Sequence, residues 1–508
     1  MSHVQIPIPS ERERKLYQLI IERLNGDDIH NGPYRQRMLS LARKGIGGFI
    51  IFGGKKDEIR DFISELNAAA GIPLFIASDI ERGVAQQIKG TTSFPCPMAV
   101  AAALEVNDPA QLALLERALL NVAHEAIETG INMPLIPVLD VNSDPDNPII
   151  CTRAFSDDPQ KVAQFGDLYV KVLEGTGLIS CPKHFPGHGD TSVDSHISLP
   201  VIAKSYAQLK ESDLLPFVRA VQAGPRSIMV GHLAIPSLDT MPASLSYEII
   251  TGLLRHDMGF KGLILTDALN MHALRDFGNV PASCLNAGVD LLLHPAKAED
   301  MVRELDYALN SGELNESVVD KALNRILSVK EELRPVIENP ARQEDRNALY
   351  RLLVDNSITM VKETPGILPL IGKVEKTARV FLSGDTALHA SSPLYRCFSD
   401  VVSLEAAAEE GGLTGVFALF TSVSAWKGSS GIPEEDKRRI QRLVGRFEKS
   451  VIVSFGSPYV LRYFGAADIL IAAYEATEAA QEAVIQRLLG DAGFTGRLPV
   501  TLQYSHEF

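Results

Sequence analysis

Short apolar runs alternate with longer amphipathic stretches over the first two-thirds of the chain. The runs are apolar on both faces, which is typical of parallel strands buried between other layers. Stretches such as KKDEIRDFISELNAAA have apolar residues at helical spacing and a glycine after the last turn, so they predict helices. The predicted strands comprise residues 18–24, 47–52, 73–78, 132–139, 177–183, 227–232, 262–267 and 289–294.

This alternation predicts an α/β fold in which each strand is followed by a helix, a (β/α)₈ TIM barrel. A doubly wound open sheet is the alternative fold. Residues with ionisable side chains stand at the ends of most predicted strands, namely Asp79, Asp140, Lys183, His184, His232, Asp267 and His294. In a barrel these positions converge on one rim, where loops build the active site, and this favours the barrel. The simpler interpretation is that polarity merely resumes where strands end.

A second alternation begins near residue 350, after a charged connector. It predicts strands at 378–384, 415–421, 450–457, 468–476 and 497–502, with amphipathic helices between them. The chain therefore divides into a barrel domain, residues 1–340, and a smaller α/β sandwich domain, residues 350–508.

Composition and charge narrow the choice of partners. The chain is 45% hydrophobic and 22% charged, as in ordinary globular proteins, and its formal net charge is -14. This acidity argues against nucleic acid or an anionic membrane as a partner. The five cysteines are scattered, and the first residues show no basic start followed by an apolar core. We therefore expect a cytoplasmic location with no membrane partner, and the sequence makes no prediction of oligomeric state.

The stretch CPKHFPGHGDTSVDSH, residues 181–196, is unusually dense in polar chemistry. One interpretation is a plain polar loop, since glycines mark loops. A second is a metal site, because His184, His188, Asp190 and His196 are all ligand types. Pro186 and two glycines exclude the helical His-x-x-x-His arrangement, and no compensating ligand cluster is evident elsewhere. We therefore predict no metal.

Acid–base chemistry is the third interpretation. Asp194 and His196 are two residues apart, so an extended loop can bring the carboxylate to one imidazole nitrogen. Such a pair fixes the tautomer of the ring and can protonate a leaving group. The stretch LILTDALNM supplies Asp267, a carboxylate just past a predicted strand, as a partner at the reacting carbon; a helix cap is the alternative role. The glycines in PGHGD, Gly187 and Gly189, are interpreted as giving the loop mobility.

Several separated stretches resemble glycoside hydrolase family 3, in particular its β-N-acetylglucosaminidase branch. They are KHFPGHGDTSVDSH, PVLDVNSDPDNPIICTRAFSDDP, LILTDALNM and SDIERG, together with C-terminal segments such as FGSPYVL and LIAAYEATEAAQEAVIQRLLGDAGFTGRLPVTL. The resemblance spans nearly the whole chain. The chain departs from the family pattern after SDIERG, where VAQQ stands in place of a second arginine.

The resemblance implies a role for each matching residue. Asp267 would be the nucleophile, His196 the general acid/base and Asp194 its partner. The residues that would bind sugar hydroxyls are Asp79, Arg153, Lys183 and His184. No cofactor is implied, and the partner is a small carbohydrate.

The implied reaction is that of a retaining exo-acting β-N-acetylglucosaminidase, which removes terminal β-GlcNAc from saccharides derived from peptidoglycan or chitin. The alternatives are a β-glucosidase or β-xylosidase of the same family, phosphorolytic cleavage of β-N-acetylglucosaminides, and a non-catalytic sugar-binding protein.

Overall fold

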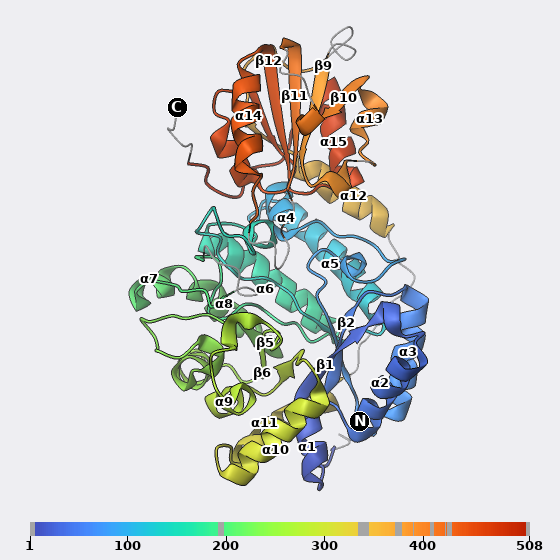
Figure 1. Cartoon of the computed structure of the whole chain (residues 1–508), viewed down its shortest axis with the longest axis vertical. Helices are drawn as coiled ribbons and strands as arrows, with labels where there is room; N and C mark the ends of the chain where they lie inside the picture. The colour runs from blue at the N-terminus through green and yellow to red at the C-terminus, as the bar shows by residue number, and fades with distance from the viewer. Residues whose placement is uncertain are drawn as a thin grey trace. The chain divides into compact units, whose positions relative to one another are not determined.

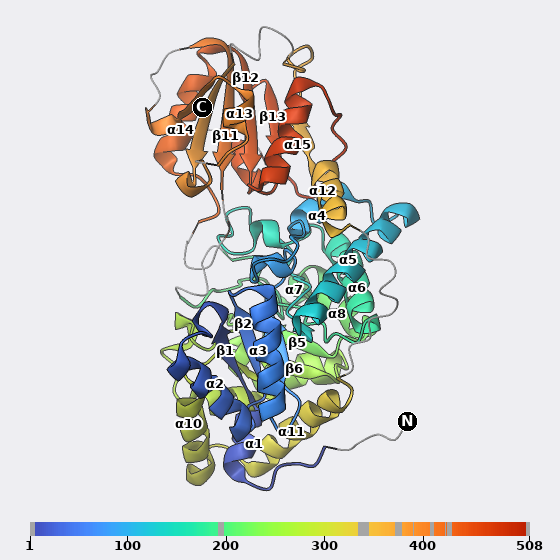
Figure 2. The same cartoon turned by 90° about the vertical axis from the view of Figure 1, so that its right-hand side faces the viewer.

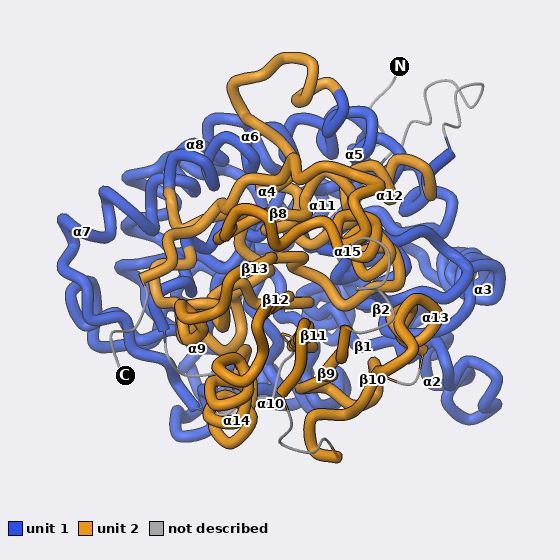
Figure 3. Tube along the Cα trace, turned by 90° about the horizontal axis from the view of Figure 1, so that it is seen from above, with its two compact units in different colours: residues 1–94, 114–141, 159–346 blue, residues 95–113, 142–158, 347–508 orange. Residues whose placement is uncertain are grey.

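The computed structural model describes residues 6–191, 198–333, 345–370, 378–389, 391–406, 411–421, 423 and 429–503. The chain forms two compact units, which Figure 3 colours separately. Unit 1 comprises Met1–Phe94, Leu114–Val141 and Pro159–Arg346, and unit 2 comprises Pro95–Ala113, Asn142–Asp158 and Asn347–Phe508. Two segments within the predicted first domain, 95–113 and 142–158, therefore group with the second unit.

Unit 1 contains seven regular strands within the described residues, all in parallel pairs. They are β1 (Ile20–Asn25), β2 (Gly48–Phe52), β3 (Phe75–Ser78), β4 (Met133–Pro134), β5 (Ser227–Val230), β6 (Leu263–Thr266) and β7 (Leu292–Leu293). Each coincides with a predicted apolar run, and nearly every residue in them is buried. Burial on both faces is why these strands read as continuous apolar runs.

The strands close into a ring in chain order. Five of them form one sheet, β4-β3-β2-β1-β7, and β5 and β6 pair separately. Three parallel bridges complete the circle: Val138 to Lys183, Phe185 to Val230, and Leu265 to Leu291. The predicted (β/α)₈ barrel is thus confirmed over the open sheet.

The fifth predicted strand, residues 177–183, is described in full but is not a regular strand. It lies in the fifth place of the ring and hydrogen-bonds to both neighbours, through Cys181 N to Ile136 O and Met229 N to Pro182 O. Pro182 lacks the N–H that a regular ladder would use at its position. Prolines 134 and 137 likewise coincide with the shortening of the predicted strand 132–139 to two residues.

Helices surround this ring, and α2 and α3 lie along the outer side of β1 and β2 in both Figure 1 and Figure 2. The α-helices associated with unit 1 are α1 (Arg12–Gln18), α2 (Gly32–Lys44), α3 (Lys56–Ala69), α5 (Pro109–Thr129), α6 (Pro159–Gly175), α7 (Tyr206–Glu211), α8 (Leu214–Ala223), α9 (Val280–Ala287), α10 (Ala298–Ser311) and α11 (Glu316–Glu331). A π-helix, η5 (Glu248–Asp257), follows β5, and short 3₁₀ turns are η1 (Gly26–Asp28), η2 (Val84–Gln86), η4 (Ala243–Leu245) and η6 (His272–Leu274).

Unit 2 is built on one six-stranded sheet of order β10-β9-β11-β12-β13-β8. Its strands are β8 (Thr359–Lys362), β9 (Ala378–Gly384), β10 (Asp400–Ser403), β11 (Gly412–Phe420), β12 (Phe447–Phe455) and β13 (Ile469–Ala472). All pairs are parallel except β13 with β8. Its helices are α4 (Pro97–Ala103), α12 (Arg346–Ser357), α13 (Leu394–Cys397), α14 (Glu434–Val444) and α15 (Glu478–Leu489), with 3₁₀ turns η3 (Cys151–Arg153), η9 (Thr386–Leu388), η10 (Leu404–Ala406) and η11 (Pro458–Tyr463).

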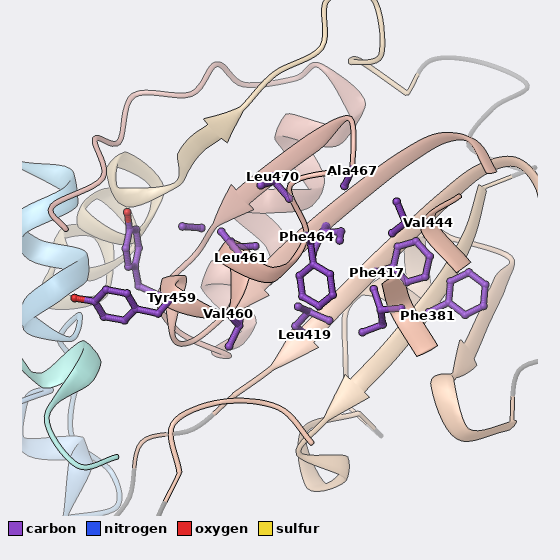
Figure 4. Packing of buried hydrophobic residues seen from close by; sticks show 14 of the residues in the cluster. Phe381, Phe417, Leu419, Val444, Tyr459, Val460, Leu461, Phe464, Ala467 and Leu470 are labelled. Atoms are coloured by element: carbon purple, nitrogen blue, oxygen red, sulfur yellow. The ribbon is translucent and has the colours of Figure 1, made fainter. Parts of the chain in front are cut away.

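Alternate residues of β11 serve two separate cores in unit 2. Phe417 and Leu419 belong to a cluster with α14 residues, and Val416, Ala418 and Phe420 belong to a cluster with α15 residues. The period of two along a strand explains this division. Figure 4 shows the first cluster, where Phe381, Phe417 and Val444 pack closely. Helices therefore cover both faces of the sheet, as the predicted α/β sandwich requires.

One strand predicted in unit 2 is wrong. Residues 497–502 are described and form no strand; Thr501 N donates instead to Asp157 Oδ2 at 2.7 Å, and the Ser156 hydroxyl donates to Pro499 O. Pro499 cannot donate to a ladder. Among the described residues, no helix is both long and apolar enough for a membrane span.

Candidate active site

The carboxyl ends of the unit 1 strands bring the predicted polar residues to one rim of the barrel. Asp79 directly follows β3, Asp267 directly follows β6, and His294 follows β7. Lys183 and His184 lie at the end of the fifth segment, where both are buried. Since parallel strands in a barrel end on the same side, these side chains share one end of the fold.

Lys183 is a buried cation between two carboxylates. Its Nζ lies 2.7 Å from Asp79 Oδ1 and 2.8 Å from Glu81 Oε1, and the residue is 1% exposed. A buried ammonium requires such partners, because leaving it unpaired away from water costs several kcal/mol (roughly 3–5). Sequence reasoning missed Glu81, although it lies two residues after Asp79 in SDIERG.

The fully buried carboxylate of Asp140 contacts both the ring and the backbone of His184. His184 Nδ1 lies 2.7 Å from Asp140 Oδ2, and the His184 N–H donates to Asp140 Oδ1 at 3.2 Å. The N–H of His188 donates to the same oxygen at 2.7 Å. Burial raises the pKa of Asp140, but the neighbouring histidines and these hydrogen bonds outweigh it and lower the pKa overall. Asp140 is therefore an ionised acceptor inside the barrel.

Asp267 is held by two backbone hydrogen bonds, and its charge acts on two histidines. Its N–H donates to Val230 O at 2.9 Å, and its Oδ1 accepts from Ala268 N at 2.7 Å. Burial lowers the pKa of His188 and of His294 to about 4 each, and the charge of Asp267 opposes that shift at both. At neutral pH both imidazoles are therefore neutral.

His294 has a backbone conformation uncommon for a residue with a side chain, with φ at 49°. Its ring centroid lies 5.7 Å from that of Phe52, and the Arg23 guanidinium lies 4.7 Å from the Phe52 ring centroid. The charges of Asp79 and Asp267 both act on His294. The ends of β3, β6 and β7 thus bring two carboxylates and a neutral imidazole into one neighbourhood.

His232 supports the segment that carries Asp267. Its Nε2 donates to Ala268 O at 3.3 Å, and its Nδ1 lies 2.8 Å from the Ser244 hydroxyl. A carbonyl oxygen can only accept, so Nε2 carries a proton and the hydroxyl can donate to Nδ1. This places a buried imidazole next to the backbone of the predicted nucleophile.

Residues 12–329 match the model of the glycosyl hydrolase family 3 N-terminal domain. The chain belongs to glycosyl hydrolase family 3. That membership confirms the predicted class of enzyme, a glycoside hydrolase.

One relative of this family 3 chain is β-hexosaminidase A of Pseudoalteromonas piscicida, 34% identical over 65% of this chain and 61% of the relative. The chain thus spans less than two-thirds of that relative's length. A β-N-acetylglucosaminidase/β-glucosidase of Cellulomonas fimi is 26% identical over 90% of this chain and 88% of its own. Among solved structures, a β-glucoside phosphorylase bound to 2FGlc aligns with a TM-score of 0.84 at 23% identity, over 97% of this chain and 94% of that one, which shows the shared fold.

Two of the residues assigned by family resemblance, Asp194 and His196, lie in the segment 192–197, outside the described residues. The residues just before that segment are tightly held. Thr191 is buried, and its hydroxyl lies 3.0 Å from His188 Nδ1. Thus the loop of this family 3 chain begins from an ordered root.

The glycines at this loop root have a packing role that the mobility interpretation did not foresee. A Cβ built on Gly189 would overlap the carbonyl oxygen of Val141, and one on Gly187 would lie 2.8 Å from the Asp213 Cβ. Gly187 also has φ at 128°, a conformation that side chains disfavour. Close approach of these neighbours is a sufficient reason for glycine at both positions, and the mobility of the loop stays a prediction.

Arg153 lies in η3 and belongs to unit 2, so the geometry of unit 1 does not include it. Its Nη1 donates to Ile149 O at 3.0 Å. Its role in sugar binding remains a prediction. Within the described part of the chain, no group of three or more His, Cys, Asp or Glu side chains is arranged to hold a metal ion.

Proposed function

We propose that this protein is a retaining exo-acting β-N-acetylglucosaminidase. It removes terminal, non-reducing β-GlcNAc from saccharides derived from peptidoglycan or chitin, and it acts in the cytoplasm. The observation that carries the proposal is the position of Asp267. This chain belongs to family 3, and its Asp267 follows β6 on the same rim as His184 and the cluster of Asp79, Lys183 and Glu81. A carboxylate there can attack a sugar held by fixed polar groups.

The proposed reaction has two displacements. In the first, the Asp267 carboxylate attacks the anomeric carbon while His196, as imidazolium, gives its proton to the departing glycosidic oxygen. The C–O bond to the aglycone breaks, and a glycosyl ester of Asp267 forms. In the second, neutral His196 takes a proton from water, whose oxygen attacks the anomeric carbon and releases the ester bond. Two inversions give overall retention.

The other residues bind or orient. Asp194 accepts a hydrogen bond from His196 and stabilises its protonated form. Lys183, held by two carboxylates, and His184, held by Asp140, donate to or accept from sugar hydroxyls. Asp79, with 26% of its side chain exposed, and Arg153 complete the proposed set of sugar contacts. Binding groups fixed in advance lower the cost of ordering the site around the sugar.

GlcNAc is proposed ahead of glucose because the relative that is 34% identical is a β-hexosaminidase. A second activity, β-glucosidase, is favoured by the Cellulomonas fimi relative, which carries both activities in its name. Phosphorolysis uses the same glycosyl ester, with phosphate in place of water as the second nucleophile, and yields a sugar 1-phosphate.

One set of assays tests these alternatives. Purified protein is given nitrophenyl β-GlcNAc and nitrophenyl β-glucoside, each with and without inorganic phosphate, and the sugar product is identified. We expect faster release from the GlcNAc compound, with free GlcNAc as product whether or not phosphate is added. Preference for the glucoside, or a sugar 1-phosphate as the main product, would replace the proposed activity with the corresponding alternative.

The nucleophile is tested by Asp267→Asn, with Asp276→Asn as a matched control. Asp276 lies in the same loop, and 87% of its side chain is exposed. We expect the first variant to lose about a thousandfold or more in kcat, since it removes the attacking group, and the second to keep wild-type kcat. A fluorinated GlcNAc glycoside should label Asp267 in the wild type, as mass spectrometry of the digested protein would show. A label on another residue contradicts the assignment.

A further inference from the structure

Asp140 joins the end of the fourth strand to two residues of the stretch that resembles the family's signature loop. One carboxylate accepts the His184 N–H, the His188 N–H and the His184 Nδ1 contact, at 3.2, 2.7 and 2.7 Å. We propose that Asp140 is a positioning residue, which decides the nitrogen that His184 offers to the sugar and anchors the root of the loop carrying His196. This inference rests on the proposed function for its kinetic part alone.

The chemistry of the pair sets the tautomer. An ionised carboxylate has acceptors and no donor, so the His184 nitrogen facing it must carry the proton. Asp140 is completely buried, which by itself disfavours its charge, but the two backbone N–H groups that it accepts favour the ionised form. Nδ1–H therefore points at Asp140, and in a ring that carries a single proton the lone pair is on Nε2. His184 then accepts a hydrogen bond from a sugar hydroxyl.

The same carboxylate also fixes the backbone of the loop root. Asp140 holds His188 through its N–H, and the His188 ring contacts the Thr191 hydroxyl at 3.0 Å. The His184 and His188 rings meet edge to face, with centroids 5.9 Å apart. Residues 184–191 are thus tied to the end of the fourth strand just before the segment that contains Asp194 and His196.

Asp140→Asn tests the inference because it keeps the shape and changes one functional group. The asparagine oxygen can still accept the two backbone N–H groups, and its NH₂ then faces His184 Nδ1. A donor there requires Nδ1 to become an acceptor, so the proton moves to Nε2. The sugar hydroxyl would meet a donor where it had an acceptor.

The first readout is nitrogen-15 NMR of protein labelled at histidine, with the His184 signals assigned by their loss in His184→Gln. We expect a proton on Nδ1 in the wild type and its transfer to Nε2 in Asp140→Asn. A wild-type His184 without a proton on Nδ1, or the same tautomer in both proteins, overturns the proposal. The wild-type spectrum decides alone if the variant does not fold.

The second readout is steady-state kinetics with nitrophenyl β-GlcNAc. We expect kcat/KM of Asp140→Asn to fall by about tenfold to a hundredfold, mainly through KM, since a hydrogen bond to the bound sugar is lost. A kcat/KM equal to that of the wild type overturns the proposal. If the wild type does not cleave the compound, the proposed function is wrong, and the NMR result still judges the role of Asp140 in setting the tautomer.

Asp290→Asn is the matched control. Asp290 is also fully buried and precedes β7 at the opposite end of the barrel, where it accepts from Arg255 and Arg325 at 2.6 Å each and from Ile264 N at 2.9 Å. We expect this variant to be less stable to heat, with kcat/KM and the His184 tautomer unchanged. Equal losses of kcat/KM in both variants would show a general structural effect and overturn the specific role of Asp140.

Discussion

At the scale of single residues, the rim of the barrel contains a buried cation, Lys183, that is paired with two carboxylates. Its ammonium is shared by Asp79 and Glu81, and both Lys183 and Glu81 are buried. We expect Glu81→Gln to lower the free energy of unfolding by about 1–3 kcal/mol, because an amide oxygen replaces a carboxylate beside a buried cation. Urea denaturation of the two proteins measures the difference.

The control for this change is Glu58→Gln on the barrel exterior. Glu58 pairs with Lys55 at 3.2 Å, and 70% of the Lys55 side chain is exposed. Exposed ion pairs contribute little, so its urea midpoint should equal that of the wild type. If Glu81→Gln were as stable as this control, Glu81 would not be a significant partner of Lys183.

The sequence pattern identified most rim residues of unit 1, but it missed Glu81 and the contacts between the rim residues. Lys183 and Asp267 stand out because each follows an apolar run at the end predicted to build the site. Glu81 has no such signal, because its importance depends on a contact with a residue about a hundred positions away. Asp140 follows a predicted strand and was identified, but its role depends on contacts with His184 and His188, which the pattern does not give. Tertiary contacts of this kind are not encoded in local pattern.

At the scale of elements, the loop root is packed against the end of the fourth strand. We expect Gly189→Ala to destabilise the protein by about 1–3 kcal/mol or more, because the added methyl group overlaps the rigid Val141 carbonyl. Thermal unfolding measures this loss. Gly175→Ala is the control, since Gly175 ends α6 and a methyl group added there would meet nothing within 4 Å.

The control variant should be unchanged or slightly stabilised, because alanine favours helix over glycine by about 0.5–1 kcal/mol. A Gly189→Ala protein with wild-type stability and reduced kcat would instead support the interpretation of this glycine as a source of loop mobility.

Strands that sit within a sheet were easier to predict than those at its edges. β11 and β12 are buried on both faces and read as apolar runs. β8 and β10 occupy the two edges of the unit 2 sheet, are four residues long and are largely half-exposed, so TMVK and DVVS gave little signal. Proline is present in the predicted strands 132–139, 177–183 and 497–502, which are shortened or absent, and it removes the donor that a regular strand needs.

At the scale of the whole chain, unit 2 includes two segments that interrupt the barrel sequence. Residues 95–113 bring Met98 and Ala99 into the core that also contains Phe417, and residues 142–158 bring Cys151. Backbone and side-chain bonds accompany this packing: Cys96 N donates to Glu475 Oε1 at 2.9 Å, and Asn142 Nδ2 donates to the Tyr459 hydroxyl at 2.8 Å. A cut at residue 346 would therefore divide the unit 2 core, because part of that core comes from segments before this residue.

This arrangement predicts that a fragment ending at residue 346 cannot fold well. Deleting 347–508 removes the partners of Met98 and Cys151, and exposing one large apolar side chain costs about 1.5–3 kcal/mol. Newly exposed apolar surface also promotes aggregation. We expect the fragment to be largely insoluble on expression, or to unfold without a cooperative transition, where the full chain is soluble and cooperative; size-exclusion chromatography and thermal unfolding decide. A soluble fragment with a sharp transition would mean that segments 95–113 and 142–158 find other partners within the barrel, and the core of unit 2 would then not be a requirement for folding unit 1.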